Sequence, residues 1–475
     1  MKRTKIVCTI GPATHTEEKL TALVKAGMNV CRLNFSHGTH EDHAELIRLI
    51  RTVSKKTEEP LTILQDLQGP KIRVGNLPEK GILLEAGKEV IFTTNEEGSS
   101  KKIPVTYQML HKDVRVGQTL LLDDGLLAAK VVKIKGQDVV CEVITGGVLT
   151  SHKGLNLPET NTSISAMSDK DRDDVAFGVE QEVDWIALSF VRKAEDVREL
   201  RSVIAAAERK QKKSGDVPIR VIAKIEKPEA ITAIAEIVEA VDAIMVARGD
   251  LGIEMPAAKV PLIQKDLICR CLLAGKPVIV ATQMLDSMIR NPRATRAEIS
   301  DIANAVIDHT DATMLSGETA SGAYPIEAVQ TMSDAIHEVE KSTLDDMALS
   351  IELQQGDQVA MTNIATVLSH ASKAKGIVVA TLSGSAAHLV SRYRPELPIL
   401  AVTPHERIVR QLNLSWGVQP FLIPECHTMS KLIEQSLKTL VKEEVLKKGD
   451  QVILVAGEPL GKSGHVNMVE LCTVK

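Results

Sequence analysis

Short apolar segments alternate with helical segments eight times in the first part of this chain. Aromatic residues are 2% of the chain against 44% for all hydrophobic residues, so the segments are built from Val, Ile, Leu and Ala. The expected strands are Lys5–Ile10, Asn29–Leu33, Leu61–Leu64, Asp184–Leu188, Ile219–Ala223, Ala243–Ala247, Pro277–Ala281 and Ala312–Leu315. The expected helices are Glu17–Ala26, Glu41–Lys55, Asp169–Glu182, Ala194–Lys212, Glu229–Ala240, Ala257–Ala274, Arg296–His309 and Ile326–Lys341. The alternation predicts an α/β (β/α)8 TIM barrel, although a larger open sheet would show the same local pattern.

One connection interrupts this rhythm, between the third strand and its helix. Its residues show a β pattern, with runs such as Leu126–Ile134 and Val139–Ile144 around turn residues. We expect a small inserted β-barrel at the mouth of the main barrel, where it can act as a lid. The predicted domains are therefore the barrel, residues 1–69 and 169–344, and the inserted lid, residues 70–168.

The alternation starts again after the barrel. A helix near Ala360–Lys373 precedes four apolar segments, Ile377–Ala380, Pro398–Val402, Val418–Leu422 and Val452–Val455. This pattern predicts a separate doubly wound α/β domain over residues 345–475.

Charge and cysteine content restrict the possible partners and location. The formal net charge is −5 with mixed signs along the chain, so we expect no binding to nucleic acid or to an anionic membrane surface. Seven scattered cysteines without framework spacing indicate a reducing compartment. With no expected signal peptide or membrane span, the predicted location is the cytoplasm.

Polar residues cluster where the expected strands end, which is where barrel enzymes carry their chemistry. Lys224 and Glu226 share one face of a strand, and Asp250 follows the next strand. Two carboxylates with open positions between them suit Mg²⁺ or Mn²⁺, although any single pair is equally compatible with a rim salt bridge. The other polar strand ends carry Arg32, Asn34, Ser36, Asp66, Arg248, Thr282, Gln283, Ser316 and Glu318.

Eight longer motifs run through the chain: Ile6–Thr14 (IVCTIGPAT), Cys31–Gly38 (CRLNFSHG), Asp66–Arg73 (DLQGPKIR), Lys153–Pro158 (KGLNLP), Lys224–Glu226 (KIE), Ile244–Glu254 (IMVARGDLGIE), Ala281–Met288 (ATQMLDSM) and Met314–Ala320 (MLSGETA). Together, and in this order, they closely resemble the pyruvate kinase family. The resemblance covers essentially the whole chain. It implies transfer of the phosphoryl group of phosphoenolpyruvate to ADP, giving pyruvate and ATP in the last step of glycolysis, by a homotetramer under allosteric control.

The resemblance also implies roles for individual residues. It assigns the phosphoryl group to Arg32, the substrate carboxylate to Gly249 and Thr282, and charge neutralisation to Lys224. The divalent metal would be held by Glu226 and Asp250, and Asp250 would also contact the substrate. The implied nucleotide-binding residues are Asn34, Ser36, His37, Arg73 and Lys153, and the implied proton-relay residues are Thr282, Ser316 and Glu318.

One position departs from the commonest family pattern. Many members bind K⁺ near positions matching Asn34, Ser36, Asp66 and Leu67, and carry Glu where this chain has Lys71. A fixed ammonium there would supply the positive charge that K⁺ gives elsewhere. We therefore expect activity that does not require K⁺.

The segment Thr381–Ala386 (TLSGSA) follows a strand of the C-terminal domain and precedes a helix. Simple N-capping and an anion site are both compatible with it. The resemblance favours a sugar-phosphate effector site with Thr381, Ser383, Gly384 and Ser385, and fructose 1,6-bisphosphate, ribose 5-phosphate and no effector all remain open.

Other motifs and functions are less well supported. The run Ala456–Ser463 nearly matches a phosphate-binding loop but lacks its first Gly and the helix that should follow. His37, His40 and His43 lack further zinc ligands. A metal-dependent lyase acting on phosphoenolpyruvate or pyruvate would share the carboxylates and Arg32, and a catalytically inactive sensor would keep only the fold and effector pocket.

Overall fold

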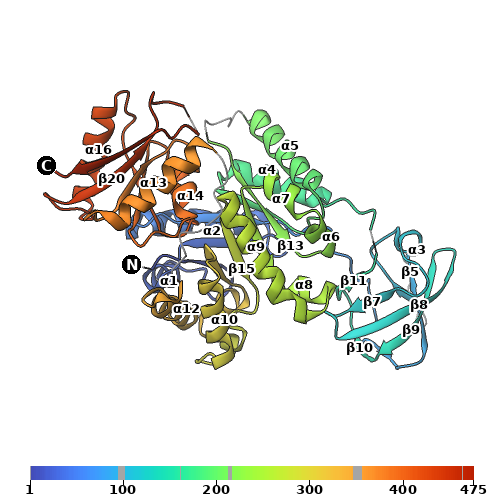
Figure 1. Ribbon diagram of the computed structural model, residues 1–475. Helices are drawn as coiled ribbons and strands as arrows, with labels where there is room; N and C mark the ends of the chain where they lie inside the picture. Colours follow the sequence, from blue (N-terminus) through green and yellow to red (C-terminus); the bar gives the residue numbers. More distant parts are fainter. Residues whose placement is uncertain (1, 95–101, 161, 212–216, 346–355, 463) are drawn as a thin grey trace.

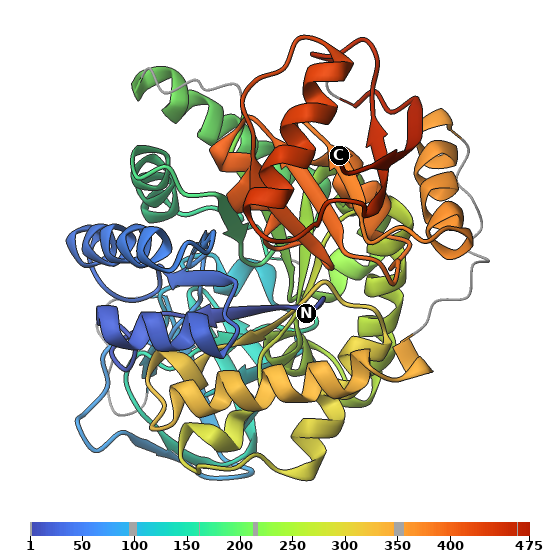
Figure 2. The ribbon, with the colours of Figure 1, turned by 90° about the vertical axis from the view of Figure 1, so that its left-hand side faces the viewer.

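The computed structural model describes residues 2–94, 102–160, 162–211, 217–345, 356–462 and 464–475. Its elements form three units: a central barrel, an inserted β unit and a C-terminal α/β unit (Figure 1). The inserted and C-terminal units lie at opposite ends of the barrel (Figure 1), and a view turned by 90° looks onto the end that the C-terminal unit covers (Figure 2). The expected boundary between barrel and C-terminal domain at 344/345 adjoins residues outside the described ranges.

Eight parallel strands close the barrel in the order β1-β16-β15-β14-β13-β12-β3-β2, which confirms the predicted TIM barrel. The strands are β1 (Lys5–Thr9), β2 (Val30–Asn34), β3 (Thr62–Asp66), β12 (Trp185–Leu188), β13 (Arg220–Ile225), β14 (Ala243–Ala247), β15 (Val278–Ala281) and β16 (Ala312–Leu315). The larger surrounding helices are α1 (Glu17–Ala26), α2 (His40–Thr57), α4 (Asp169–Glu180), α5 (Ala194–Gln211), α9 (Val260–Ala274), α10 (Arg296–Ile307) and α12 (Pro325–Glu340).

Four short helices depart from the expected pattern. The helix expected at 229–240 is divided into α6 (Pro228–Thr232) and α7 (Ile234–Ala240), because Ala233 has non-helical backbone angles. A further helix, α8 (Arg248–Glu254), begins directly after β14, and α11 (Gly317–Ala320) directly after β16. Two of the polar strand ends are therefore the first turns of short helices.

The barrel strands are buried on both faces, as expected for a parallel sheet covered by helices. Alternate residues point inward, and Trp185, Ile222, Met245 and Met314 belong to the inner cluster. Leu414 of the C-terminal unit belongs to the same cluster, so that unit packs into the base of the barrel.

The inserted unit follows β3 and returns to the barrel at α4. A six-stranded sheet forms most of it, in the order β11-β7-β8-β9-β5-β6, with a separate two-stranded sheet, β10-β4. Its own hydrophobic cluster includes Phe92, Leu120 and Val139. The elements are β4 (Ile82–Leu84), β5 (Glu89–Thr93), β6 (Lys102–Pro104), α3 (Leu110–Asp113), β7 (Thr119–Leu122), β8 (Leu127–Lys135), β9 (Asp138–Thr145), β10 (Gly147–Leu149) and β11 (Leu155–Asn156).

The C-terminal unit has a five-stranded sheet in the order β19-β18-β17-β20-β21, with only β21 antiparallel. Its strands are β17 (Ile377–Ala380), β18 (Ile399–Thr403), β19 (Val418–Leu422), β20 (Gln451–Ala456) and β21 (Met468–Thr473). Its helices are α13 (Asp357–Ala371), α14 (Ser385–Ser391), α15 (Glu406–Leu412) and α16 (Met429–Lys442). Strand β21, and no helix, follows the run at 456–463, which agrees with rejecting a phosphate-binding loop there.

Buried ion pairs join the C-terminal unit to the barrel. Arg394 pairs with Asp311 at 2.9 Å between Nη2 and Oδ2, and both side chains are more than nine-tenths buried. Arg410 of α15 pairs with the fully buried Asp184 at 2.7 Å between Nε and Oδ1. Among the described helices, none is long and apolar enough to span a membrane.

Candidate functional site

The candidate site begins with an ion pair between the ends of two adjacent strands. Arg32 on β2 donates from Nε to Asp66 Oδ2 on β3 at 2.6 Å, and from Nη1 to Thr9 Oγ1 on β1 at 2.8 Å. The register places Asn34 beside Asp66, so the carboxyl ends of β2 and β3 are level. The guanidinium is therefore fixed by strands on both sides.

Lys224 on β13 lies at the centre of the charged groups. Its Nζ is 2.9 Å from Glu226 Oε1 and 3.3 Å from Asp66 Oδ1, and it donates to Ser189 Oγ at 2.9 Å. Burial alone would lower the pKa of Lys224, but the charges of Asp66 and Glu226 outweigh it and raise that pKa above its usual value. The side chain is therefore a firmly charged ammonium.

The Asp66 and Glu226 carboxyls respond differently to this environment. Burial favours the neutral form of both, yet Lys224 and Arg32 together hold the pKa of Asp66 below its usual value. For Glu226, burial and the nearby charge of Asp250 outweigh Lys224 and raise the pKa. The Glu226 carboxyl, one residue beyond the end of β13, is thus close enough to the Asp250 carboxyl on α8 for the two to repel each other.

A divalent cation bound between the two carboxyls would relieve this repulsion. Mg²⁺ or Mn²⁺ commonly uses one or two protein carboxylates and takes its remaining ligands from water and substrate oxygens. Among the residues that the structure describes, no three His, Cys, Asp or Glu side chains converge to form a complete protein cage. Glu226 and Asp250 are therefore suited to an ion that is shared with a substrate.

Helix α8 and the end of β15 form a second part of the site. The backbone N–H of Gly249 donates to Thr282 Oγ1 at 2.7 Å, and a Cβ at residue 249 would lie only 3.3 Å from that oxygen. Arg248 anchors the helix by donating to the Thr282 carbonyl at 2.9 Å and by pairing with Asp301 at 2.7 Å. Thr282 has φ of 71°, a strained conformation for a β-branched residue that is typical of functional sites.

Glu318 lies beneath the loops that follow β15 and β16. Its Oε1 accepts from the Leu285 backbone N–H at 3.0 Å and its Oε2 from the Ser316 backbone N–H at 2.7 Å. Burial raises the pKa of Glu318, although these hydrogen bonds oppose the shift. Glu318 therefore hydrogen-bonds both the loop after β15, which carries Thr282, and the loop after β16, which carries Ser316.

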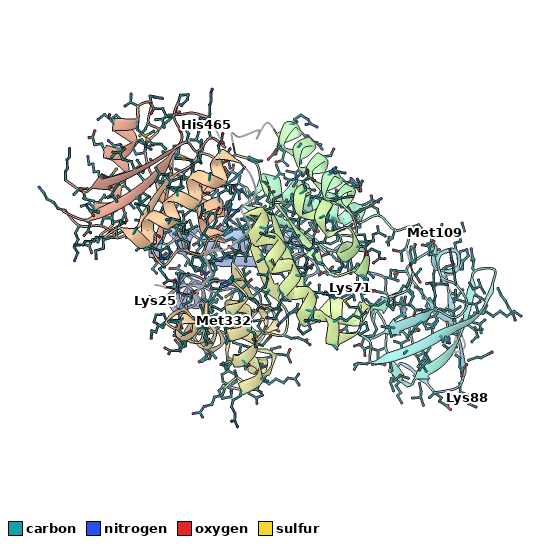
Figure 3. All side chains as sticks on the ribbon, in the orientation of Figure 1. Lys25, Lys71, Lys88, Met109, Met332 and His465 are labelled. Carbon is teal, nitrogen blue, oxygen red and sulfur yellow. The ribbon has the colours of Figure 1, made fainter. Side chains whose placement is uncertain are left out.

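The four residues expected near a monovalent ion lie on neighbouring strand ends. Asn34 Oδ1 accepts from the Ser36 backbone N–H at 3.2 Å, and the buried Leu67 carbonyl accepts from Ser189 Oγ at 2.7 Å. Lys71 is exposed and lies between the barrel and the inserted unit (Figure 3). Its side chain lines a cavity together with Asp250 rather than occupying the buried cluster.

That cavity is narrow and lies between the barrel and the inserted unit. It is lined by Lys71, Asp124, Asn156, Phe190, Lys227 and Asp250, among others. Arg73 and Lys153, the expected nucleotide residues of the inserted unit, lie on neighbouring segments. Arg73 Nη1 donates to the His152 carbonyl at 2.9 Å, and Lys153 Nζ is 2.7 Å from Asp123 Oδ1.

The three histidines near the end of β2 do not converge on one point. His43 Nε2 lies 2.9 Å from the His37 carbonyl and its ring stacks on Phe35, whereas His40 pairs with Asp174 at 2.7 Å. His40 and His43 instead pack against the loop that carries Asn34, Ser36 and His37. This geometry supports the rejection of a zinc site.

A second cavity, of about 260 Å³, lies in the C-terminal unit. Thr381 and Ser385 line it, together with His405, Glu425, Lys462 and His465. The other two expected effector residues turn the loop: Gly384 has φ of 83° and donates to Thr381 Oγ1 at 2.8 Å, and the Ser383 carbonyl accepts from Arg220. The structure thus brings two of the four expected effector residues to a cavity.

Three site residues were missed in the sequence. Ser189 contacts Lys224, Phe190 donates its backbone N–H to Glu226 Oε2 at 2.7 Å, and Thr9 contacts Arg32. Ser189 and Phe190 directly follow β12 and Thr9 ends β1, so position at a strand end was the available signal.

Comparison with known proteins agrees with this geometry. Models of the pyruvate kinase barrel domain and of the pyruvate kinase alpha/beta domain match residues 1–329 and 357–472. Pyruvate kinases of Staphylococcus aureus strains USA300 and N315 are each 46% identical over 479 aligned residues, covering 99% of this chain and 80% of the relative. The crystal structure of a pyruvate kinase from Cryptosporidium parvum superposes with a TM-score of 0.93 at 36% identity, covering 100% of this chain and 96% of the other. The chain therefore belongs to the pyruvate kinase family, whose members are phosphotransferases.

Proposed function

We propose that this enzyme transfers the phosphoryl group of phosphoenolpyruvate to ADP through the charged groups at the barrel mouth. The observation that carries the proposal is the convergence of Lys224, Asp66 and Glu226, with Arg32 and Asp250 beside them. Phosphoryl transfer depends on positioning and charge stabilisation more than on covalent participation of the protein. A prearranged ammonium and guanidinium match that requirement.

In this proposal Arg32 binds the phosphoryl group, because two of its nitrogens are already fixed by Asp66 and Thr9. Gly249 and Thr282 would receive the substrate carboxylate at the start of α8, where the Gly249 N–H and the Thr282 hydroxyl lie within hydrogen-bond distance of each other. Lys224 neutralises the charge that develops as the enolate forms. Its raised pKa supports this role, since the ammonium stays protonated throughout.

Glu226 and Asp250 would hold Mg²⁺ or Mn²⁺. Bound there, the divalent ion would neutralise phosphoryl oxygens and help to orient them. Burial raises the pKa of Glu226 most, and the charge of Asp250 adds to that rise, so the two carboxyls lie near each other, which supports this assignment.

The inserted unit, residues 70–168, acts in this proposal as a lid that brings Arg73 and Lys153 to the nucleotide phosphates. Asn34, Ser36 and His37 would contact the nucleotide from the barrel side. The cavity between the two units, lined by Asp250 on one side and by Lys71 and Asp124 on the other, supports this division of roles.

Protonation of the enolate completes the reaction, and we assign it to the region of Thr282, Ser316 and Glu318. Both oxygens of Glu318 accept backbone hydrogen bonds, so its main contribution is to hold the two loops that carry Thr282 and Ser316. The hydroxyl groups of those residues would relay the proton.

We further propose that the enzyme does not require K⁺, because Lys71 brings a fixed positive charge to the cavity that contains Asp250. Asn34, Ser36, Asp66 and Leu67 would otherwise form the monovalent site. An assay free of K⁺ and Na⁺ tests this directly, since strong stimulation on adding K⁺ would overturn it.

Regulation by a phosphorylated metabolite is proposed at the second cavity, where Thr381 and Ser385 face Lys462 and two histidines. Ser383 and Gly384 would shape the loop around a sugar phosphate. We also propose a homotetramer in the cytoplasm, on the basis of family membership alone.

A coupled assay for pyruvate tests the proposed function, run with and without ADP and Mg²⁺. Pyruvate should form only with both, and Glu226→Gln and Asp250→Asn should each raise the Mg²⁺ concentration needed for half-maximal rate. Cleavage of phosphoenolpyruvate without nucleotide would favour the rival lyase, which has no evident use for Arg73 and Lys153.

A further inference from the structure

Helix α8 connects the two walls of the active-site cavity. Its first turn carries Gly249 and Asp250, and its last residue, Glu254, accepts a hydrogen bond from Asn156 Nδ2 of the inserted unit at 2.8 Å. Gly125 of the inserted unit also lies near Ile253 of α8, since a Cβ added at residue 125 would be 3.8 Å from Ile253 Cγ2. Figure 1 shows α8 directly beside the inserted unit, near β7, β10 and β11.

The Glu254 carboxylate is held from both sides. Its Oε1 lies 2.6 Å from Lys227 Nζ of the barrel as well as 2.8 Å from Asn156 Nδ2. Glu254 is only 4% exposed, and its Oε2 has no hydrogen-bond partner among the described residues. A buried carboxylate of this kind depends strongly on the donors it has.

We propose that Glu254 is a positioning residue that couples the placement of the inserted unit to the placement of Gly249 and Asp250. Lys227 keeps the carboxylate in place, and Asn156 binds to it when the inserted unit lies over the cavity. Since α8 has only seven residues, a shift of its last residue is passed to its first turn. The inference rests on the lid role proposed above.

An isosteric exchange tests the contact. Asn156→Asp replaces the donor by a second carboxylate facing Glu254, so we expect KM for ADP to rise about tenfold, the size expected for losing a charge-assisted hydrogen bond. KM for phosphoenolpyruvate should rise as well, by a smaller factor of about threefold, because a shift of α8 also moves Gly249 and Asp250, which contact that substrate in the proposed function. In the double variant Asn156→Asp/Glu254→Gln, residue 156 becomes the hydrogen-bond acceptor and residue 254 the donor. The double variant should reverse most of the rise in KM for ADP.

Lys102→Gln provides a matched control, because it breaks an ion pair with Asp138 inside the inserted unit and leaves the barrel untouched. It should leave both KM values unchanged. If Asn156→Asp behaves like this control, or if the double variant shows no recovery, the proposed coupling is wrong.

A distance measurement makes the result independent of activity. One spin label can be placed on the exposed Cys269 of α9 and another on the inserted unit through Lys133→Cys, with Cys426→Ser to remove the other partly exposed thiol. Asn156→Asp should shift the label distances toward a more open arrangement, and the double variant should reverse that shift. Unchanged distances would overturn the coupling, whereas failure of the wild-type enzyme to form ATP would overturn only the proposed function.

Discussion

Lys224→Met is the most informative single substitution at the barrel mouth. The wild-type ammonium lies 2.9 Å from Glu226 and 3.3 Å from Asp66, and each such contact is worth about 5 kcal/mol before desolvation at an effective dielectric constant of about 20. Methionine fills the space but leaves the carboxyls facing each other. The variant also loses the charge proposed to stabilise the developing enolate.

Removing one preorganised donor of this kind costs about 2.7–4 kcal/mol, or roughly 10²- to 10³-fold in kcat. We expect the loss mainly in kcat, because Arg32 still binds the phosphoryl group. Pyruvate formation with saturating ADP and Mg²⁺ measures it, and thermal unfolding monitored by circular dichroism checks that the variant is folded. Ser189→Ala removes one hydrogen bond to Nζ and one to the Leu67 carbonyl but keeps the ammonium, and should cost less than about tenfold. A folded Lys224→Met variant with near-normal turnover would refute the role of Lys224.

Three further results are expected. Lys71→Glu should make the rate depend on K⁺ in a K⁺- and Na⁺-free assay in which the wild type does not respond, and equal responses would contradict the role of Lys71. Arg394→Met should lower the free energy of unfolding in urea by about 3 kcal/mol, because it leaves the buried Asp311 without its cation, whereas Arg198→Met at an exposed pair should change it by less than about 1 kcal/mol. Burial and the charge of Arg220 lower the pKa of His388 well below its usual 6.5, so the unfolded state takes up a proton that the folded state does not. Stability should therefore fall as pH drops below 6.5, by up to about 1.4 kcal/mol per pH unit from this residue, and His388→Asn should show a shallower dependence between pH 7.5 and 5.5; parallel curves would exclude this contribution.

Most of the barrel could be predicted because each strand and helix carries its own periodicity. Ala243–Ala247 and Ala312–Leu315 were expected with the bounds that the structure shows, and the other barrel strands differ by one or two residues at an end. The two short helices α8 and α11 were missed because their residues directly follow strands and are too few to show a helical period. The polar residues Asp250 and Glu318 were therefore expected at strand ends but lie in helical turns.

The contacts between site residues were harder to predict than which residues belong to the site. The two-residue spacing at the end of β13 places Lys224 and Glu226 on one face, but nothing local indicates that Asp66 and Ser189 also contact Lys224. The contact between Asn156 and Glu254 joins residues 98 positions apart in different units. Such pairs depend on how the inserted unit settles on α8, which is a property of tertiary packing.

The most direct test of the central claim follows the phosphoryl group itself by ³¹P NMR. The enzyme is mixed with phosphoenolpyruvate, ADP and Mg²⁺, and the reaction is repeated without ADP. The arrangement of Arg32, Lys224, Glu226 and Asp250 predicts that phosphoenolpyruvate disappears only with ADP, while ATP appears in an amount equal to the phosphoenolpyruvate lost. Release of inorganic phosphate, or loss of phosphoenolpyruvate without ADP, would contradict it.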